Sequence, residues 1–365
     1  MENNGRKLAS IQLITNLEPI EGKDRIVLAS VLGWRVIVKK NEFKIGDKCV
    51  YIEIDSVMPE KPEFEFLRNK KFRIRTMKLG NTYSQGIVFP LSILPKEKEY
   101  NIGDDVTDIL GIKKYDPQIE EEMIFNIPAK NIKKYPQFLM RFAWFRKLVL
   151  PNKKQQRGFP TEYISKTDEV RVQVIPEVLK NKEPVVVSEK IDGSSCSYLL
   201  IKYKTWYRKT KYEFIVCSRN LRLWVPDGSY YWEMAKKYNI EEKLKQMLED
   251  NDWIAVQGEC YGASIQSNPY KMNNRELRIF NVIYPSGRMG SIEAKELCDK
   301  NDLLFVPIIN ENFILPDTVE EMLNYATAKS IINQNILREG VVVRSKDGKH
   351  SFKAVSPEYL IKHEQ

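Results

Sequence analysis

The sequence predicts an α+β protein in which antiparallel sheets dominate. Two observations lead to this class. The first 110 of the 365 residues contain five or so short runs of strand-type residues, separated by turns rich in Gly, Asp and Asn. Beyond residue 159, strand-like runs alternate with helix-like segments and outnumber them. Consecutive short strands mixed with a few helices favour α+β over a parallel doubly wound sheet.

The N-terminal strand pattern is typical of a small barrel. Strand-type residues fill 25–40, with a break at Leu32-Gly33, and 49–59, where apolar and polar residues alternate. Residues 72–79 alternate basic and apolar side chains, and 85–94 form a last strand. Among small barrels the OB fold fits best. One face would present cations to phosphates, although a barrel that only packs on its neighbour is the alternative; these cations are Arg68, Lys70, Lys71, Arg73 and Arg75.

Residues 111–158 change in character and are expected to connect two domains. The acidic run at 120–122 gives way to a basic aromatic segment, with a short helix expected over 137–150. This divides the chain into a barrel (1–110), a connector (111–158) and a second domain (159–365).

The second domain is expected to contain antiparallel sheets with flanking helices. Strand-like runs cover 184–191, 197–203, 213–220, 252–262, 276–284 and 339–345. Helix-like runs cover 230–250, 291–303 and 318–335. The last begins with a capping signal, with Asp317 or Thr318 as N-cap and Glu320 or Glu321 three residues later.

Composition excludes several common kinds of site. The five cysteines are scattered without a C-x-x-C pair, so neither a disulfide framework nor a zinc site is indicated. Both histidines lie near the C-terminus, which makes a serine-hydrolase triad hard to build. P-loop and G-x-G-x-x-G motifs do not occur. We find no apolar run of the roughly 20 residues that span a bilayer and no secretory signal, so we expect an intracellular protein, in cytoplasm or nucleus.

The formal charge of +9 is unevenly distributed. Residues 66–78 carry six Lys/Arg and 128–157 carry nine, both without an acidic residue and both interleaved with aromatics. A single run of this kind can be a solvated basic face. Two of them favour a polyanion with stackable bases, which means nucleic acid.

Polar groups of the second domain lie where apolar runs end. Lys190 and Asp192 occur in EKIDG, and other charged residues follow or flank later strands: Arg219, Glu259, Glu339 and Lys353. Strands that share a sheet would bring these ends around one groove. If the groove holds a nucleotide, a lysine can attack phosphorus, carboxylates can hold a divalent metal, and an aromatic can stack on the base. Taken singly, each has a plainer explanation: a turn at K-x-D-G, a surface carboxylate at Glu259, a core aromatic at Phe280.

The ordered series resembles the covalent nucleotidyltransferase superfamily of ATP-dependent ligases and mRNA capping enzymes. The segments are EKIDGSS, CSRN, VQGECYG, RIFNVIY, REGVVVRS and SFKAVSPEYL, spread over residues 189–360. FPTEYISKTDEVRVQ, at 159–173, resembles a signature of RNA ligases. With the β-rich region placed first, the whole chain is similar to RNA ligases with an N-terminal OB domain, the Deinococcus and Naegleria type.

This resemblance implies an ATP-dependent RNA ligase that works through a lysyl-AMP adduct and an adenylylated 5′ end. Lys190 would be the nucleophile, and Asp192, Glu259 and Glu339 would serve a Mg²⁺ or Mn²⁺ ion. Glu259 would contact either the AMP ribose or the hydrated metal. Nucleotide contacts would come from the remaining motif residues: Arg171, Glu189, Arg219, Phe280 and Lys353. The implied substrate is nicked duplex RNA, or an RNA-containing duplex, with RNA required on the 3′-OH side. A monomer without membrane contact is expected.

One departure from the pattern concerns the last motif. Related ligases often have two lysines one residue apart there, whereas Ser351 and Val355 flank Lys353 at alternate positions. A second cation is either missing or supplied from elsewhere, by Lys346 or Lys349. Two other functions stay open on the sequence: a DNA ligase, and a nucleic-acid-binding protein with an inactive nucleotidyltransferase fold.

Overall fold

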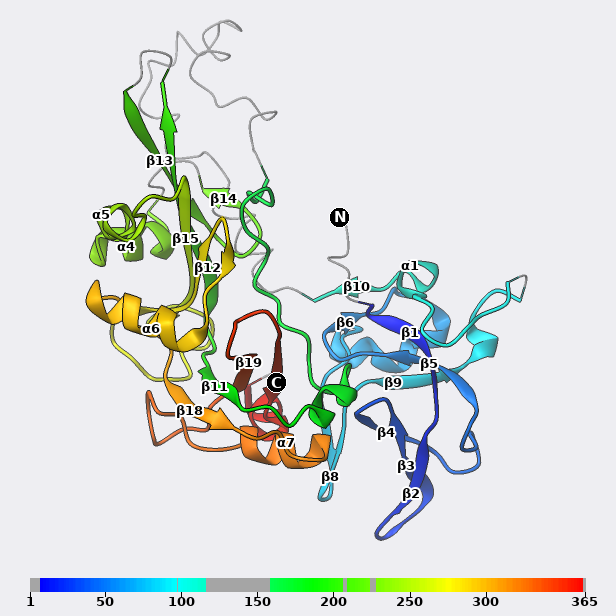
Figure 1. Cartoon of the computed structure of the whole chain (residues 1–365). Helices are drawn as coiled ribbons and strands as arrows, with labels where there is room; N and C mark the ends of the chain where they lie inside the picture. Colours follow the sequence, from blue (N-terminus) through cyan, green and yellow to red (C-terminus); the bar gives the residue numbers. More distant parts are fainter. Residues whose placement is uncertain (1–6, 97, 116–157, 206–208, 224–227, 364–365) are drawn as a thin grey trace, which may run out of the picture.

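The computed structural model describes residues 7–96, 98–115, 158–205, 209–223 and 228–363. The helix expected over 137–150, and nearly all of the basic aromatic connector, lie outside these residues. The described chain forms two bodies side by side, one from the N-terminal strands and one from residues after 158 (Figure 1).

The N-terminal body consists of small antiparallel sheets around one core. β1 (Ala9–Leu13), β5 (Lys48–Ile52) and β9 (Ile87–Pro90) form one sheet, and β2 (Asn16–Ile20), β3 (Lys23–Val31) and β4 (Trp34–Lys39) form another. Two short pairs complete it: β6 (Ser56–Val57) with β10 (Lys113–Lys114), and β7 (Met77–Leu79) with β8 (Thr82–Ser84). The largest buried side chains of this core are Trp34 and Tyr51. The break at Leu32-Gly33 is the turn between β3 and β4.

The alternating strand expected over 72–79, within and just beyond the basic run at 66–78, is only partly formed. The first residues of the basic run belong to a 3-10 helix, η1 (Pro62–Lys70), and Lys71 and Phe72 then adopt left-handed φ values of 52° and 56°. These two residues turn the chain sharply, so that Arg73 forms only an isolated bridge with Val57 and the regular strand is shortened to β7.

The second body holds two antiparallel sheets. A six-stranded sheet has the order β14 (Arg222–Leu223), β13 (Thr210–Cys217), β12 (Ser194–Lys204), β15 (Trp253–Gly262), β16 (Arg275–Tyr284), β17 (Gly287–Arg288). A four-stranded sheet has the order β18 (Ile308–Phe313), β11 (Val185–Lys190), β19 (Gly340–Ser345), β20 (Ser351–Val355). The α+β prediction is therefore confirmed.

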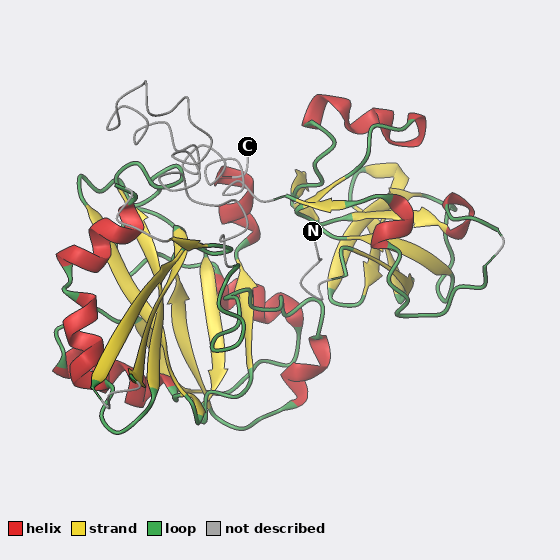
Figure 2. Ribbon diagram, turned by 90° about the horizontal axis from the view of Figure 1, so that it is seen from above, coloured by secondary structure: helices red, strands yellow, loops and turns green. Residues whose placement is uncertain are grey.

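Helices cover the outer faces of these sheets (Figure 2). α4 (Tyr230–Lys237), α5 (Ile240–Met247) and α6 (Ser291–Lys300) pack on the six-stranded sheet, and α7 (Val319–Ala326) packs on the four-stranded one. The helix predicted over 230–250 is split, because Asn239 has a left-handed φ of 50°. Thr318 is the N-cap of α7 and forms a capping box with Glu321, and that helix ends well before residue 335. The remaining helical turns are short: η2 (Leu91–Ile93), α1 (Thr107–Leu110), η6 (Pro176–Lys180) and α8 (Pro357–His363).

The two bodies are joined by packing as well as by the chain. The N–H of Gly33 donates to the carbonyl of Gln173 at 2.9 Å, and a Cβ at Gly33 would lie 2.8 Å from the Gln173 Cα. Val355 and Leu360, from the C-terminal end, are buried in the N-terminal core. Within the described residues, no helix has both the length and the apolar character needed to cross a membrane.

Candidate active site

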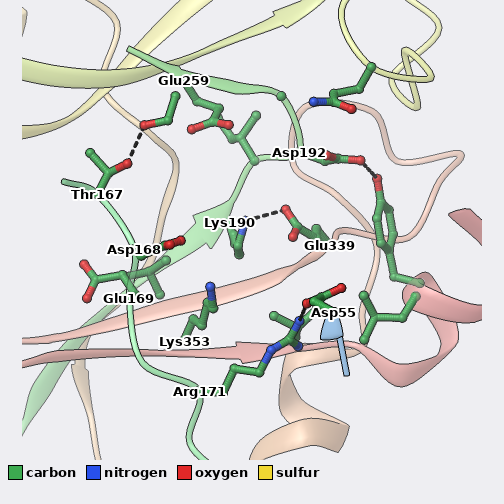
Figure 3. Close-up of a pocket in the computed structure, with 18 of the residues that line it drawn as sticks. Asp55, Thr167, Asp168, Glu169, Arg171, Lys190, Asp192, Glu259, Glu339 and Lys353 are labelled. Atoms are coloured by element: carbon green, nitrogen blue, oxygen red, sulfur yellow. Dashed lines mark hydrogen bonds and ion pairs between the residues drawn. The ribbon is translucent and has the colours of Figure 1, made fainter. Parts of the chain in front are cut away.

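A cavity of about 440 Å³ lies where the two sheets and the N-terminal body meet. This volume falls in the range of roughly 300–1,000 Å³ that is typical of small-molecule sites. Its lining includes every nucleotide and metal residue suggested by the motifs: Arg171, Glu189, Lys190, Asp192, Arg219, Glu259, Phe280, Glu339 and Lys353. Residues dispersed over more than 180 positions of sequence are thus brought to one cavity (Figure 3).

Lys190 is the last residue of β11, a central strand of its sheet, and is paired with Gly340 of β19. That pairing places Glu339 beside it, and the Lys190 Nζ lies 2.7 Å from Glu339 Oε2. A Cβ at position 340 would lie 2.2 Å from the Ala354 carbonyl oxygen, so only glycine allows β19 and β20 to approach this closely.

Three carboxylates surround this ammonium group. Burial lowers the pKa of Lys190, but the charges of Glu339, Glu259 and Asp192 outweigh it and raise the pKa above its ordinary value. Burial, together with Glu339, raises the pKa of Glu259 to about 8, against the lowering effect of Lys190. Burial and Glu339 also raise the pKa of Asp192 to about 6. The cluster therefore carries more negative charge than its one lysine can neutralise.

Asp192 and Gly193 are fixed in the turn that follows β11. The Tyr359 hydroxyl donates to Asp192 Oδ2 at 2.7 Å, and the Asp192 N–H donates to the Tyr270 hydroxyl at 2.9 Å. A Cβ on Gly193 would lie 2.3 Å from the Cys260 carbonyl oxygen. Glycine is thus required at 193 by the closeness of β15, which brings the neighbouring Glu259 to Lys190.

Cations occupy the opposite wall. Asp168 forms ion pairs with Arg219 and Lys114. Although burial raises the pKa of Asp168, the charges of Arg219, Lys353 and Lys114 hold that pKa well below its usual range. The backbone of Arg171 forms an isolated parallel β-bridge with Lys353 of β20. The segment upstream of β11 therefore runs beside β20.

The N-terminal body contributes to the same wall. Asp55 accepts from Arg171 at 3.1 Å and from Arg73 at 3.2 Å, and Arg75 also lines the cavity. Arg171 is 6% exposed, and two of its nitrogens, Nε and Nη1, have no hydrogen-bond partner among the described residues. A buried guanidinium with unsatisfied donors that faces a cavity is suited to an anion.

The structure places neither Lys346 nor Lys349 at the cavity. Lys346 Nζ donates to Asn312 Oδ1 at 2.6 Å, and Lys349 pairs with Asp347 with 77% of its side chain exposed. Val355, at the alternate position after Lys353, is buried in the N-terminal core. Besides Lys190 and Lys353, the cations among the described residues that line this cavity are Lys114 and five arginines: Arg73, Arg75, Arg171, Arg219 and Arg344.

Phe280 and Glu189 have different environments within the site. Phe280 is partly buried on β16 and shares the cavity with Val306 and Val342, which gives an apolar slot. The Glu189 carboxylate accepts from the Ser330 hydroxyl at 2.5 Å and from the Ile331 N–H at 2.8 Å. Burial raises the pKa of Glu189 although both hydrogen bonds lower it.

Sequence reasoning did not single out several residues of this site: Asp55, Lys114, Asp168, Tyr270 and Tyr359. Asp168 and Tyr359 lie inside segments that carried the resemblance, so a closer inspection of those segments would have found them. Asp55 has a left-handed φ of 69°, which the sequence does not reveal, and Lys114 lies at the start of the connector.

The site fits a hydrated divalent cation. Within the described ranges, no three His, Cys, Asp or Glu side chains converge closely enough to hold a metal by themselves. Mg²⁺ typically keeps several waters and binds through one or two carboxylates and substrate phosphates. The excess of carboxylates around Lys190 agrees with that mode of binding.

Comparison with known proteins identifies the family. A family model described as an OB-fold domain matches residues 8–91, and one described as RNA ligase matches residues 183–355. No curated protein matches the chain. The solved structure of Naegleria gruberi RNA ligase with PPi is 32% identical with a TM-score of 0.78, and the match covers 98% of this chain and 99% of that one.

Two structures of mutants of that ligase give the same result. One, with ATP and Mn, is 31% identical with a TM-score of 0.78, covering 99% of this chain and 100% of the other. The second, with AMP and Mn, is 32% identical with a TM-score of 0.78, covering 98% and 99%. Because identity of about a third extends over nearly the whole chain and both domains have a matching family model, the chain belongs to the RNA ligase family with an N-terminal OB-fold domain.

Proposed function

We propose that this RNA ligase uses ATP and a divalent cation to form a lysyl-AMP adduct at Lys190. One observation carries the proposal: the Lys190 ammonium lies among three carboxylates, in a cavity whose other wall is lined with cations. The related Naegleria ligase has structures with ATP and Mn and with AMP and Mn, which supports the same ligands here.

The geometry supports activation of Lys190 by a divalent cation. An ammonium group is no nucleophile, and the carboxylates around Lys190 favour its protonated form. A divalent cation held beside Asp192, Glu259 and Glu339 would supply the positive charge that lowers the pKa of Lys190 and neutralises phosphate oxygens. After losing its proton, Nζ would bond to the α-phosphorus while the bond to pyrophosphate breaks.

The remaining residues are suited to hold the nucleotide. Phe280, with Val306 and Val342, would take the adenine by stacking and apolar contact. Lys353 and Arg219 would contact the α-phosphate and the transferred group, and Arg171 the outgoing phosphates. Glu189, whose carboxylate also orders residues 330–331, would contribute to the base end of the pocket.

We propose that AMP then passes from Lys190 to a 5′-phosphate, and that a 3′-OH displaces AMP to seal a nick in duplex RNA or an RNA-containing duplex. The boundaries 1–110, 111–158 and 159–365 are proposed for the OB domain, connector and ligase domain. A monomer is proposed as the active unit. All five cysteines are buried and free, which supports a reducing intracellular compartment, cytoplasm or nucleus.

The test is covalent labelling. With α-labelled ATP and Mg²⁺ or Mn²⁺, the wild type should acquire one label and Lys190→Ala none. Lys346→Ala, which removes a lysine outside the cavity, is the matched control and should label normally. An unlabelled wild type would favour an inactive nucleotidyltransferase fold, and a labelled Lys190→Ala would exclude Lys190 as the nucleophile.

Substrate choice needs a second experiment. Nicks that differ only in ribose or deoxyribose at the 3′-OH terminus should be sealed at clearly different rates, with ribose faster, since the 2′-OH is the chemical difference available. Equal sealing of an all-DNA nick would favour the DNA ligase alternative.

A further inference from the structure

The hairpin between β12 and β13 extends beyond the rest of its sheet. β12 pairs with β15 only as far as Ile201–Trp253, whereas its pairing with β13 continues to Lys204–Thr210. Figure 1 shows these two strands projecting past α4 and α5. We call residues 202–204 and 209–212 the tip ribbon. Among the described residues, it has no third strand beside it.

The tip ribbon is basic and aromatic. It carries four lysines, two tyrosines and no acidic residue: Lys202, Tyr203, Lys204, Lys209, Lys211 and Tyr212. Each tyrosine lies opposite a lysine, in the pairs Lys202–Tyr212 and Tyr203–Lys211. Tyr203 and Tyr212 are 45% and 43% exposed.

Edge protection explains only part of this composition. Lysines on exposed strands prevent edge-to-edge pairing, so their presence alone has a plain explanation. Exposed tyrosines add apolar surface instead, and a projecting two-stranded hairpin gains little stability of its own. Lysines alternating with amphipathic rings are, however, suited to a phosphate backbone and its sugars.

One face of the tip ribbon belongs to the catalytic face of the sheet. Side chains two residues apart on a strand share a face, so Tyr203 lies on the same side of β12 as Ser195, which lines the cavity. Ser195 pairs with Glu259, and Tyr203 pairs with Lys211. Eight residues of strand place Tyr203 roughly 26 Å from Ser195. This distance corresponds to about nine base pairs of an A-form RNA duplex.

We propose that the tip ribbon binds the sugar–phosphate backbone of one arm of the nicked duplex, about nine base pairs from the reacting ends. The proposal rests on the function proposed above. Lys209 and Lys211 lie on the same face as Tyr203, because Tyr203 pairs with Lys211 and the ladder continues with the Thr205 N–H donating to the Lys209 carbonyl at 2.9 Å. These two lysines would neutralise phosphates, and the Tyr203 hydroxyl would hydrogen-bond a ribose 2′-OH across the shallow minor groove of RNA.

The experiment compares arm lengths in the full-length protein. Lys209→Ala/Lys211→Ala should bind a nicked RNA duplex with 14-base-pair arms about tenfold more weakly than the wild type in moderate salt. The slope of log affinity against log salt concentration should become shallower by about two. Binding to a nick with 5-base-pair arms should be unchanged, as should covalent labelling with ATP. Lys209→Arg/Lys211→Arg should restore binding to long arms.

A matched control removes two lysines elsewhere on the same body. Lys236→Ala/Lys300→Ala takes the same charge from α4 and the end of α6 and should bind both substrates normally. Equal losses of affinity for short and long arms would overturn the proposal. No loss of affinity for long arms would also overturn it, and would favour a different partner for the tip ribbon, such as an acidic protein. Failure of the wild type to label with ATP would overturn the proposed function instead, since duplex binding is measured without ATP.

Discussion

The two walls of the cavity differ in charge and in origin. The wall around Lys190 is rich in carboxylates, and β11, the turn after it, β15 and β19 of one folded body build it. The opposite wall is rich in cations. Arg73 and Arg75 come from the N-terminal body, Arg171 from the segment upstream of β11, Arg219 from the loop after β13, and Lys353 from β20.

This difference separates two tasks. Under the proposed function, the carboxylates next to Lys190 would hold its proton until a divalent cation binds, so that wall would control the activity of the nucleophile. The buried guanidinium of Arg171 is suited to phosphates. Because Asp55 pairs with Arg73 of one body and Arg171 of the other, the second wall is complete only while the two bodies are docked.

The largest effect is expected from the carboxylate wall. Glu339→Ala removes the carboxylate nearest to the Lys190 Nζ and with it a main support for the cation. We expect the rate of covalent labelling with ATP to fall about 10²- to 10³-fold, as for loss of a group that stabilises developing charge. Initial labelling rates at several Mg²⁺ concentrations measure this. Glu296→Ala, on the exposed side of α6, should change nothing; a Glu339 variant within threefold of wild type would refute the assignment.

The next largest effect is expected where the two bodies pack together at the cation-rich wall. Asp55→Ala leaves Arg73 and Arg171 without their shared carboxylate, and Asp55 is 18% exposed on its side chain. Since breaking a largely buried ion pair leaves charge uncompensated, the free energy of unfolding should fall by about 3 kcal/mol. Denaturant unfolding measures it.

An exposed pair between the same two bodies supplies the control. Arg35 of β4 pairs with Glu320 of α7 at 3.1 Å, and their side chains are 41% and 67% exposed. Glu320→Ala should cost about 0–1 kcal/mol. Equal effects of the two variants would show that Asp55 does not hold the bodies together.

The same contrast explains what could be predicted from the sequence. Lys190 ends β11 and Glu339 directly precedes β19, as the apolar runs of the sequence predict. Glu259 and Lys353 were also expected at strand ends, and this was wrong, because β15 and β20 continue past them. The strand class of the first 110 residues was also visible from turns and alternation. These features depend on neighbours close in sequence.

Features that depend on docking were not predictable in the same way. The contact of Asp55 with Arg171 joins residues 116 positions apart. The split of the helix at Asn239 and the turn at Lys71 and Phe72 depend on left-handed backbone that propensity did not indicate. Lys346 and Lys349 are the lysines nearest to Lys353 in the sequence that could supply a second cation. Packing instead brings arginines of the N-terminal body and Arg171 to the cavity.

The pH dependence of stability tests the crowding of carboxylates around Lys190. The folded state raises the pKa of Glu259 to about 8, mainly through burial, so the folded protein binds this proton more tightly than the unfolded chain does. The contribution of this proton to the free energy of unfolding should therefore be fully present below the ordinary carboxyl pKa. It should be lost as the pH rises towards 8. Between pH 6 and 8 we expect the free energy of unfolding of the metal-free protein to fall by about 2 kcal/mol.

A variant of Glu259 and the addition of Mg²⁺ identify the source of this loss of stability. Glu259→Gln cannot ionise and should remove most of the fall, and millimolar Mg²⁺ should reduce it in the wild type. Thermal unfolding at pH 6, 7 and 8 provides the measurement. A wild-type curve that stays flat without metal would mean that the carboxylates are not crowded in solution.

The smallest effect is expected at the slot between the two walls. Phe280→Leu keeps the slot apolar but removes the ring that would stack on adenine, and stacking contributes about 0.5–1.5 kcal/mol beyond area burial. KM for ATP in the labelling reaction should rise about three- to tenfold, while the maximal labelling rate changes little, because neither wall is altered. Phe66→Leu, on a ring that is 62% exposed in the N-terminal body, should leave both parameters unchanged. A fall in the maximal rate with unchanged KM would mean that Phe280 positions the reacting groups. The slot would then share the task of the two walls and could not be treated as a separate binding element.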